Sequence, residues 1–542
     1  MDNSALLVFK FYLYLSFLFL LGRSFVIIIS KFSRQKVNIN STIHGLDIQI
    51  FYPIIGIFFL GNYLYILNYL LPVKSKFSYL IFLFIFLNFI EPFELKKLRE
   101  FIITLPFYLI ILVSSYDINF HYDAGLYHLN NQYWIRESNI IFGFSNIYGP
   151  FGVGSIYEYI SAFLWLDSTF MLIHFTNLTF VGLLYTFLFY NLIRNKNKEL
   201  YASSLLLVIY SIIDNFGYTG GRNGFINIQS IGKQDLPIAV LFLIVSVLLL
   251  TSILKKSFTE EELILYSIFS LFIFQLKISG FAIIFFYLVY LYSYLKETGN
   301  TFNWLLSKLK FYILLATIWL AKSIIQTGCI IFPLQSSCFS SLGWVNIDYL
   351  TNIENVTVNY SNSYYFGDSI SDWFQKYFEV PANLAISINF CISVLVIYLI
   401  SKTFFYNKKS LKKNKIITFL LLISFLFYLR FGPDMRYLSG LMMLGIFCIG
   451  IDIKIKKDIP KLLINILIIA SLLMVPKLDS YKSINLSTNP SILVPEKPTK
   501  KLYNRFAPES GDQCWININC SANLQNYKID KNNYFTIVTL QE

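Results

Sequence analysis

Long apolar runs, separated by short polar tracts, make up most of the chain. The clearest runs lie at 50–71, 170–193, 236–254, 278–295, 383–404 and 437–452, and weaker ones lie at 6–29, 78–94, 100–115, 200–214, 263–276, 311–328, 416–430 and 461–475. A helix that crosses a bilayer needs about 20 apolar residues, because lipid offers its backbone no hydrogen-bond partners. The pattern therefore predicts an all-α polytopic membrane protein with about 14 transmembrane helices.

Composition supports this fold class and excludes others. Of the 542 residues, 56% are hydrophobic and only 14% are charged, whereas an ordinary soluble domain has roughly 25% charged residues. So much apolar surface excludes a disordered chain and a soluble enzyme of two or three domains. The formal net charge is +13, but the basic residues occupy short tracts between apolar runs, as in cytoplasmic membrane loops. We therefore expect membrane lipids, and no nucleic acid, as partners.

The basic tracts also predict which loops face the cytoplasm. Lys and Arg gather at 96–99, 194–198, 255–256, 296–310, 408–415 and 454–461. If these tracts are cytoplasmic, the outer loops are 116–169, 215–235, 326–382 and 431–436, followed by an outer tail. Lys74 and Lys76 fall on the wrong side of this threading. We expect a transmembrane domain over 1–475 and a small extracytoplasmic region over 476–542, with a strand at 534–540, in a protein of the cytoplasmic (inner) membrane.

Four of the six cysteines favour the same sidedness. Cys329 and Cys338 share one expected outer loop, and Cys514 and Cys520 share the outer tail. Disulfides persist in oxidising compartments, so two close pairs outside the cytoplasm predict two disulfides, with a connectivity that rests on spacing alone. A zinc site is the less favoured alternative, because neither pair has the short CxxC spacing.

The first outer loop gathers polar side chains that are costly near a membrane. It reads SSYDINFHYDAGLYHLNNQYWIRESNIIFGFSNIYGPFG and contains Asp117, His121, Asp123 and His128. Residues 124–137 have helical spacing, which predicts a helix in the membrane interface with Asp123 as its N-cap. These residues could instead have a purely structural role, in which Asp123 caps the helix and the aromatic residues anchor it in the membrane interface.

Further charged side chains lie in later outer loops or where helices reach the outer surface. They are Arg222, Lys233, Asp235, Lys277, Arg430, Asp434 and Arg436. Arginine forks match phosphate oxygens, and the glycines at 217–224 could let backbone N–H groups approach a phosphate. The alternatives are a turn-rich connector at 215–235, a snorkelling Lys277, and an Asp434–arginine pair with lipid head-group contacts.

Together these residues would give the outer face a carboxylate pair, an aspartate–lysine pair and several cations. Such a set could activate a hydroxyl and hold a phosphate or pyrophosphate leaving group. No cofactor is certain from the sequence. A divalent cation held by Asp117, Asp123 and Asp235 is an alternative that their spacing does not support.

The polar residues of the expected outer face resemble those of a known superfamily. An aspartate in the first outer loop, a following YH and aromatic helix, a second aspartate and a basic loop near the last helices are similar to the GT-C glycosyltransferases, which use polyprenyl-phosphate-linked donors. More narrowly, DAGLYHLNNQYWIRESNIIFGFSNIYGPFG, KSIIQTGCIIFP and FGPDMRY resemble segments of a group of uncharacterised bacterial multi-pass membrane proteins. That group typically ends the first segment with an arginine that NIYGPFG lacks, so no role is assigned to it.

The resemblance implies roles for individual residues. Asp123 would be the general base that deprotonates the acceptor, and Asp235 would be the second acidic site, which assists acceptor or metal binding. Lys277 and Arg436 would contact the donor phosphate by position, and the transferase hypothesis adds Arg430 to the cations that stabilise the phosphate as it leaves. The implied protein is a glycosyltransferase that moves a sugar from a polyprenyl-phosphate-linked donor to an acceptor on the outer side of the membrane.

Two other function classes stay open at this stage. A transporter or flippase of lipid-linked saccharide would use the same cations for binding alone, but such proteins favour internal repeats and sites at the midplane. A polysaccharide polymerase or ligase would rely on a long arginine-rich loop as its only polar centre. A pocket that contains Asp123 and Asp235 together would favour the transferase.

Overall fold

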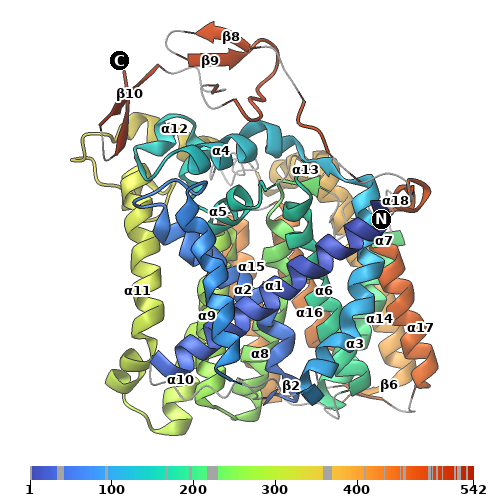
Figure 1. The fold of residues 1–542 in the computed structure, drawn as a ribbon. Coiled ribbons are helices and arrows are strands. Elements are labelled where there is room, and N and C mark those ends of the chain that lie inside the picture. Colours follow the sequence, from blue (N-terminus) through green and yellow to red (C-terminus); the bar gives the residue numbers. More distant parts are fainter. Residues whose placement is uncertain are drawn as a thin grey trace.

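The structure is a computed structural model, and its elements are drawn in Figure 1. It describes residues 3–32, 42–91, 95–166, 169–194, 198–216, 230–357, 369–407, 411–431, 434–451, 453–455, 459–485, 490, 492–495, 499–502, 505–517, 520–521, 526–532 and 535–541. The α-helices are α1 (Asn3–Phe32), α2 (Tyr52–Leu67), α3 (Leu95–Leu112), α4 (Leu129–Glu137), α5 (Ile156–Phe163), α6 (Met171–Phe189), α7 (Lys198–Phe216), α8 (Asp235–Lys255), α9 (Glu260–Leu276), α10 (Ile283–Thr298), α11 (Phe302–Thr327), α12 (Ile347–Thr357), α13 (Ile370–Glu379), α14 (Pro381–Phe404), α15 (Leu411–Phe431), α16 (Ser439–Ile449), α17 (Lys461–Met474) and α18 (Leu478–Lys482).

Short irregular helices and strands connect these elements. The 3₁₀ helices are η1 (Ile48–Phe51), η2 (Lys76–Phe89), η3 (Val113–Asp117), η5 (Phe144–Asn146), η6 (Gly149–Val153), η8 (Ile278–Ala282), η9 (Gln335–Ser337) and η11 (Met435–Leu438), and η4 (Ala124–His128) and η7 (Tyr190–Arg194) are π-helices. The strands are β1 (Thr42–Ile43), β2 (Leu46–Asp47), β3 (Asn119–Phe120), β4 (Ile141–Phe142), β5 (Ser230–Ile231), β6 (Phe405–Asn407), β7 (Ile453–Ile455), β8 (Thr499–Leu502), β9 (Arg505–Pro508), β10 (Tyr527–Lys531) and β11 (Thr536–Leu540).

The long apolar helices bear out the expectation of a mostly helical membrane protein. Within the described residues, eight helices are long and apolar enough to cross a membrane by length and composition. They are Ser4–Lys31, Ile48–Leu67, Leu98–Asp117, Met171–Arg194, Asp235–Lys255, Ile278–Thr298, Phe302–Thr327 and Pro381–Lys402. The remaining predicted runs are also helical, in η2, α7, α9, α15, α16 and α17, but the predicted count of about 14 spans is not confirmed.

Helix α8 forms the centre of this bundle. Every residue from Leu236 to Ile253 is buried, and α6, α9, α10 and α16 pack around it. A helix that is apolar on all sides avoids water only in such a position. Its first residue, Asp235, lies at one end of the bundle, which we call the site end, and its last residue, Lys255, lies at the opposite end, which we call the basic end.

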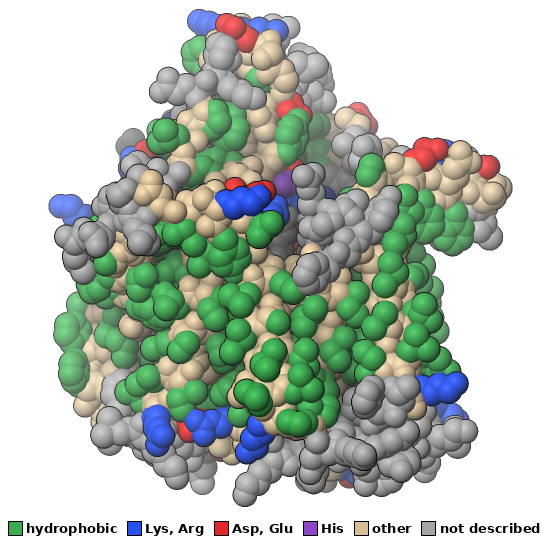
Figure 2. All heavy atoms as spheres, turned by 90° about the vertical axis from the view of Figure 1, so that its right-hand side faces the viewer, with side chains coloured by type: hydrophobic (Ala, Val, Ile, Leu, Met, Phe, Trp, Pro, Cys, Tyr) green, Lys and Arg blue, Asp and Glu red, His purple; other side chains and the backbone are tan. Residues whose placement is uncertain are grey.

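The surface of the bundle separates charge from apolar side chains. Figure 2 shows a broad band of hydrophobic side chains, with charged side chains above and below it. At the basic end, Lys256 pairs with Glu297 at 2.7 Å, and Lys308 pairs with Glu260. The band matches the apolar zone that a membrane helix presents to lipid.

Lys74, which the sequence placed on the wrong side, lies at the site end beside α4. Its ammonium pairs with Glu137, and its backbone N–H donates to the carbonyl of Arg136 at 3.3 Å. The lysine therefore serves an ion pair at this end, and it does not mark a basic loop.

The described part of the C-terminal region packs on loop 116–169 at the site end (Figure 1). Strand β11 pairs in parallel with β4, so that Thr536 lies opposite Ile141, and β10 pairs with β11. The hydroxyl of Ser521 donates to the carbonyl of Ile147 at 2.7 Å. The strand expected at 534–540 is thus present as β11, and the region has little core of its own.

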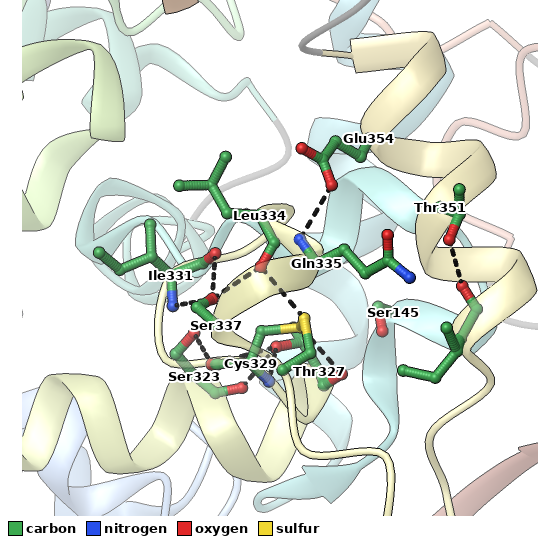
Figure 3. Close-up of a disulfide and its surroundings, with 12 residues drawn as sticks. Ser145, Ser323, Thr327, Cys329, Ile331, Leu334, Gln335, Ser337, Thr351 and Glu354 are labelled. Carbon is green, nitrogen blue, oxygen red and sulfur yellow. Dashed lines mark hydrogen bonds between the residues drawn. A yellow bond between two sulfur atoms is a disulfide. The ribbon is translucent and has the colours of Figure 1, made fainter.

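Both predicted disulfides are present, Cys329–Cys338 and Cys514–Cys520. The first closes a turn after α11, where Cys329 accepts a hydrogen bond from the hydroxyl of Ser323 at 2.9 Å (Figure 3). In the same view, the backbone N–H of Gln335 donates to Glu354 of α12 at 2.9 Å. The disulfide turn therefore joins the end of a membrane helix to the loop helices above it.

The contact between Trp515 and Gly125 allows a first prediction. A methyl group at Gly125 would lie 2.7 Å from the Trp515 ring, and the backbone N–H of Trp515 donates to the Gly125 carbonyl at 2.9 Å. Gly125→Ala should therefore lower the midpoint of thermal unfolding, with an expected cost of about 1–3 kcal/mol from overpacking. Gly343→Ala is the control, because its added carbon meets nothing within 4 Å. Equal midpoints for the two variants would contradict the contact.

Candidate functional site

A polar cavity of about 50 Å³ lies at the site end, beside the first turn of α8. It is lined by Asp123, Tyr127, His128, Asn131, Pro150, Val153, Gly154, Ser155, Glu158, Gly232, Lys233, Gln234, Asp235, Lys277 and Arg436. Six of the residues proposed from the sequence are among these, including Asp123 and Asp235, and they come from segments more than 300 positions apart in the chain. Three carboxylates and three cationic side chains therefore share one small space.

Two short strands bring the first loop to the start of α8. Strand β3 pairs in parallel with β5, and the backbone N–H of His121 donates to the carbonyl of Ile231 at 2.9 Å. Gly232 follows with φ +93°, and a carbon added there would lie 2.8 Å from the Ala124 side chain. Only glycine fits this conformation and this close approach. The pairing therefore sets Asp123 beside the segment 232–235.

Asp235 and Lys277 form the buried ion pair of the cavity. The Lys277 ammonium lies 3.2 Å from a carboxylate oxygen of Asp235, and their side chains are only 23% and 16% exposed. Lys277 occupies the extended residue between α9 and η8, so the break between these helices turns its side chain toward α8. The ammonium also lies 4.3 Å from the centre of the Tyr437 ring. The carboxylate and the ring together offset the loss of hydration.

Arg436 reaches the same cavity from the turn before α16. Its Nε donates to Asp434 at 3.1 Å, and its terminal nitrogen donates to the Tyr437 hydroxyl at 3.1 Å. Asp434 thus orients the guanidinium from outside the cavity. Arg430 behaves differently from the sequence-based expectation, because it lies over the Phe431 ring and does not line the cavity.

Asp123 is held by His121 and does not act as a side-chain cap. Asp123 occupies the N-cap position of η4, as expected, but its carboxylate accepts no cap hydrogen bond. Instead, the carboxylate lies 3.2 Å from Nδ1 of His121. Burial disfavours its charged form, but the His121 hydrogen bond and the charges of His121, His128 and Arg436 outweigh burial and lower the pKa of Asp123 to about 2. Asp123 is therefore ionised throughout the physiological pH range.

Lys233 is the least paired cation of the cavity. Among the described residues it makes no hydrogen bond and no ion pair. Burial lowers its pKa from the ordinary value, although the charges of Asp235 and Asp123 act in the opposite direction. An ammonium in this state gains most from an anionic ligand, because such a ligand would supply a direct ion-pair partner.

Glu158, which sequence reasoning did not propose, is the deepest acid of the cavity. Its residue is 3% exposed, and it accepts hydrogen bonds from His128 and Gln234 on one oxygen and from Gln132 at 2.8 Å on the other. The ring N–H of Trp165 in turn donates to Gln132 at 2.8 Å. The signal was present in the sequence, since SIYEYISAF places a single acid in an apolar helix, where an ionisable residue is costly.

The remaining proposed residues fall outside the cavity. Asp117 ends η3 and does not line it, so Asp117, Asp123 and Asp235 do not form one cluster. Arg222 lies outside the described residues. Over the described ranges, no group of three or more His, Cys, Asp or Glu side chains could hold a metal ion. The divalent-cation alternative thus gains no support from the geometry.

The cavity residues run from Asp123 to Arg436 along the chain. A family model described as "Domain of unknown function (DUF8201)" matches residues 5–443, a range that includes all of them. No curated protein and no solved structure matches the chain. The C-terminal region that packs on loop 116–169 lies beyond the matched residues. Because the model matches most of its length, the chain belongs to the family defined by this domain of unknown function.

Proposed function

We propose that the protein is a membrane glycosyltransferase of the GT-C type, which moves a sugar from a polyprenyl-phosphate-linked donor to an acceptor outside the cytoplasm. The observation that carries the proposal is one cavity with both Asp123 and Asp235 beside three cationic side chains. Such a set suits a reaction in which a phosphate leaves and a hydroxyl attacks, because both changes of charge then occur beside fixed opposite charges.

The three cations of the cavity would bind the phosphate of the sugar donor. Lys233, Lys277 and Arg436 line the cavity together, and Lys233 makes no direct ion pair among the described residues. A phosphate monoester anion released from the sugar would gain charge-assisted hydrogen bonds from these groups. Their partial burial strengthens each bond, since water competes less there.

The carboxylates would act where the acceptor hydroxyl attacks the sugar. The acceptor oxygen forms a bond to the anomeric carbon, the bond from that carbon to the phosphate oxygen breaks, and its electron pair stays on the phosphate. Positive charge develops on the sugar ring during such a displacement. Asp123 and Asp235 would stabilise this charge. The proton of the acceptor hydroxyl passes to a base in the same cavity, and the resemblance assigns this role to Asp123.

We place the site end outside the cytoplasm, in the inner membrane. The proposal is supported by the basic residues Lys255 and Lys256 at the opposite end of α8 and by two disulfides near the site end. Basic loops favour the cytoplasm, and disulfides favour an oxidising compartment. The donor lipid would enter from the bilayer, because the cavity lies at the end of a membrane helix.

The flippase and the polymerase are the competing readings. A flippase would need a site near the midplane, whereas this cavity begins at the first residue of α8. A polymerase would depend on arginines of a long loop, whereas the cavity contains one arginine and three carboxylates. Both observations favour the transferase.

The test uses purified full-length protein in lipid nanodiscs. Binding of farnesyl phosphate is compared with binding of farnesol, and a panel of farnesyl-phosphate-linked glucose, mannose and galactose serves as donors, with methyl glycosides and water as acceptors. We expect phosphate-dependent binding and release of farnesyl phosphate from at least one donor. Equal binding of farnesol, or movement of labelled donor across liposome membranes without release, would contradict the proposal.

A further inference from the structure

A histidine–glutamate pair lies in the cavity, and the proposed reaction as described so far gives it no role. Nδ1 of His128 hydrogen-bonds to a carboxylate oxygen of Glu158, and the two side chains are 7% and 4% exposed. Gln132 and Gln234 donate to the same carboxylate. All three partners of Glu158 can donate a hydrogen bond, so both oxygens of its carboxylate act as acceptors.

This arrangement determines which nitrogen of His128 is available. A carboxylate oxygen accepts hydrogen bonds, so Nδ1 carries the hydrogen in the contact with Glu158. In the neutral imidazole, the lone pair then lies on Nε2. Nε2 has no hydrogen-bond partner in the described part of the chain, although His128 lines the cavity. The residue therefore presents a basic nitrogen whose orientation is fixed by a buried acid, as in the histidine–carboxylate pairs of hydrolases.

Asn131 adds a second acceptor next to it. It follows His128 by three positions, so the two side chains lie on the same side of the helix. Its residue is 4% exposed, and its buried Oδ1 has no hydrogen-bond partner among the described residues. A buried polar atom without a partner points to a missing donor. Since Asn131 lines the cavity, a hydroxyl group of a ligand would satisfy it.

We propose that His128, oriented by Glu158, is the group that takes the proton of the acceptor hydroxyl, and that Asn131 binds a neighbouring hydroxyl of the same acceptor. The acceptor is accordingly a sugar or another polyol. The inference rests on the proposed transfer reaction and replaces the expected role of Asp123 as the base.

The environment of Asp123 supports this division of roles. Its carboxylate is already engaged by His121 and lies near Arg436. A group that is strongly stabilised as an anion is a weak proton acceptor, because catalytic bases work best when their pKa lies near the working pH. Asp123 then keeps its charge throughout the reaction and stabilises the positive charges that form on the sugar and on His128.

The step balances in protons and electrons. As the acceptor oxygen bonds to the anomeric carbon, its proton moves to Nε2 of His128. The electron pair of the broken carbon–oxygen bond remains on the departing phosphate. The imidazolium that results is paired with the Glu158 carboxylate, and it returns its proton to water after the products leave.

The experiment measures release of farnesyl phosphate from the active farnesyl-phosphate-linked donor, together with the affinity for farnesyl phosphate. His128→Ala should reduce the release rate about 100-fold and leave the affinity unchanged. Added imidazole should restore much of the lost rate, because it can occupy the vacated space and take the proton. Glu158→Gln should reduce the rate by about tenfold or more, since the amide orients the imidazole without the negative charge. Asn131→Leu should weaken the apparent affinity for methyl glycosides more than it slows hydrolysis by water.

The matched control is Asp123→Asn, whose loss imidazole should not repair. The inference is overturned if His128→Ala keeps more than half of the wild-type rate, if imidazole restores nothing, or if the variant loses affinity for farnesyl phosphate in the same proportion. Failure of the proposed function looks different, because wild-type protein would then release farnesyl phosphate from no donor. That result would remove the transfer reaction and, with it, the role of His128.

Discussion

Asp123→Asn is expected to lower the rate of farnesyl phosphate release about 1000-fold, while the protein still inserts into the membrane and folds. The substitution removes the negative charge that lies with Asp235 and Glu158 opposite three cations. Loss of one preorganised group that stabilises charge mainly in the transition state typically costs a factor of about 100–1000. The amide has nearly the same size as the carboxylate, so packing should not change.

Asp117→Asn is the matched control for that variant. Asp117 belongs to the same loop and carries the same side chain, but it does not line the cavity. Its variant should release farnesyl phosphate at the wild-type rate. If both variants lose activity equally, the loss reflects the loop as a whole, and if Asp123→Asn is fully active, the cavity has no catalytic carboxylate at this position.

Lys277→Met should destabilise the protein by about 3 kcal/mol, because it leaves the largely buried carboxylate of Asp235 without its direct partner. The same variant should lose most of its affinity for farnesyl phosphate. The double variant Lys277→Met, Asp235→Asn should recover much of the stability, since no unpaired charge remains, but it should not recover the affinity. The midpoint of thermal unfolding and the farnesyl phosphate titration separate the two effects.

Lys256→Met tests whether loss of an ion pair away from the cavity also lowers stability and farnesyl phosphate affinity. Lys256 pairs with Glu297 at 2.7 Å, but its side chain is 69% exposed. Exposed pairs contribute about 0–1 kcal/mol, so this variant should unfold and bind nearly as the wild type does. A comparable loss in both variants would argue against a special role for the pair at the cavity.

The sequence predicted the helical fold and much of the cavity for the same physical reason. Lipid excludes unpaired polar groups, so apolar runs mark helices, and a charged residue next to such a run marks a special position. That reasoning identified Asp123, Asp235, Lys277 and Arg436, which meet in one cavity.

What the sequence did not reveal depends on contacts between distant segments. The strands β3 and β5 have two residues each, too few for a periodic pattern, yet their pairing positions Asp123. The π-helix η4, which ends at His128, shifts the helical register there, and residue spacing cannot show this shift. Glu158 gains its partners from two other segments, so its isolated position in an apolar helix was the only available sign. Arg430 lies in the last turn of α15 and does not line the cavity, which its nearness to Arg436 in the sequence could not show.

The attachment of the C-terminal strands to loop 116–169 has a consequence for how the protein is made. Trp515 lies on Gly125, three residues before His128, and β11 extends the edge formed by β4. These contacts come from the part of the chain that leaves the ribosome after every helix of the bundle. Under the proposed orientation, the helices can insert one by one during translation. Loop 116–169, which carries Asp123 and His128, then receives its last support only after the C-terminal strands have crossed the membrane and the disulfide Cys514–Cys520 has formed. If the protein is the proposed transferase, chains truncated before Trp515 should insert into the membrane and remain inactive.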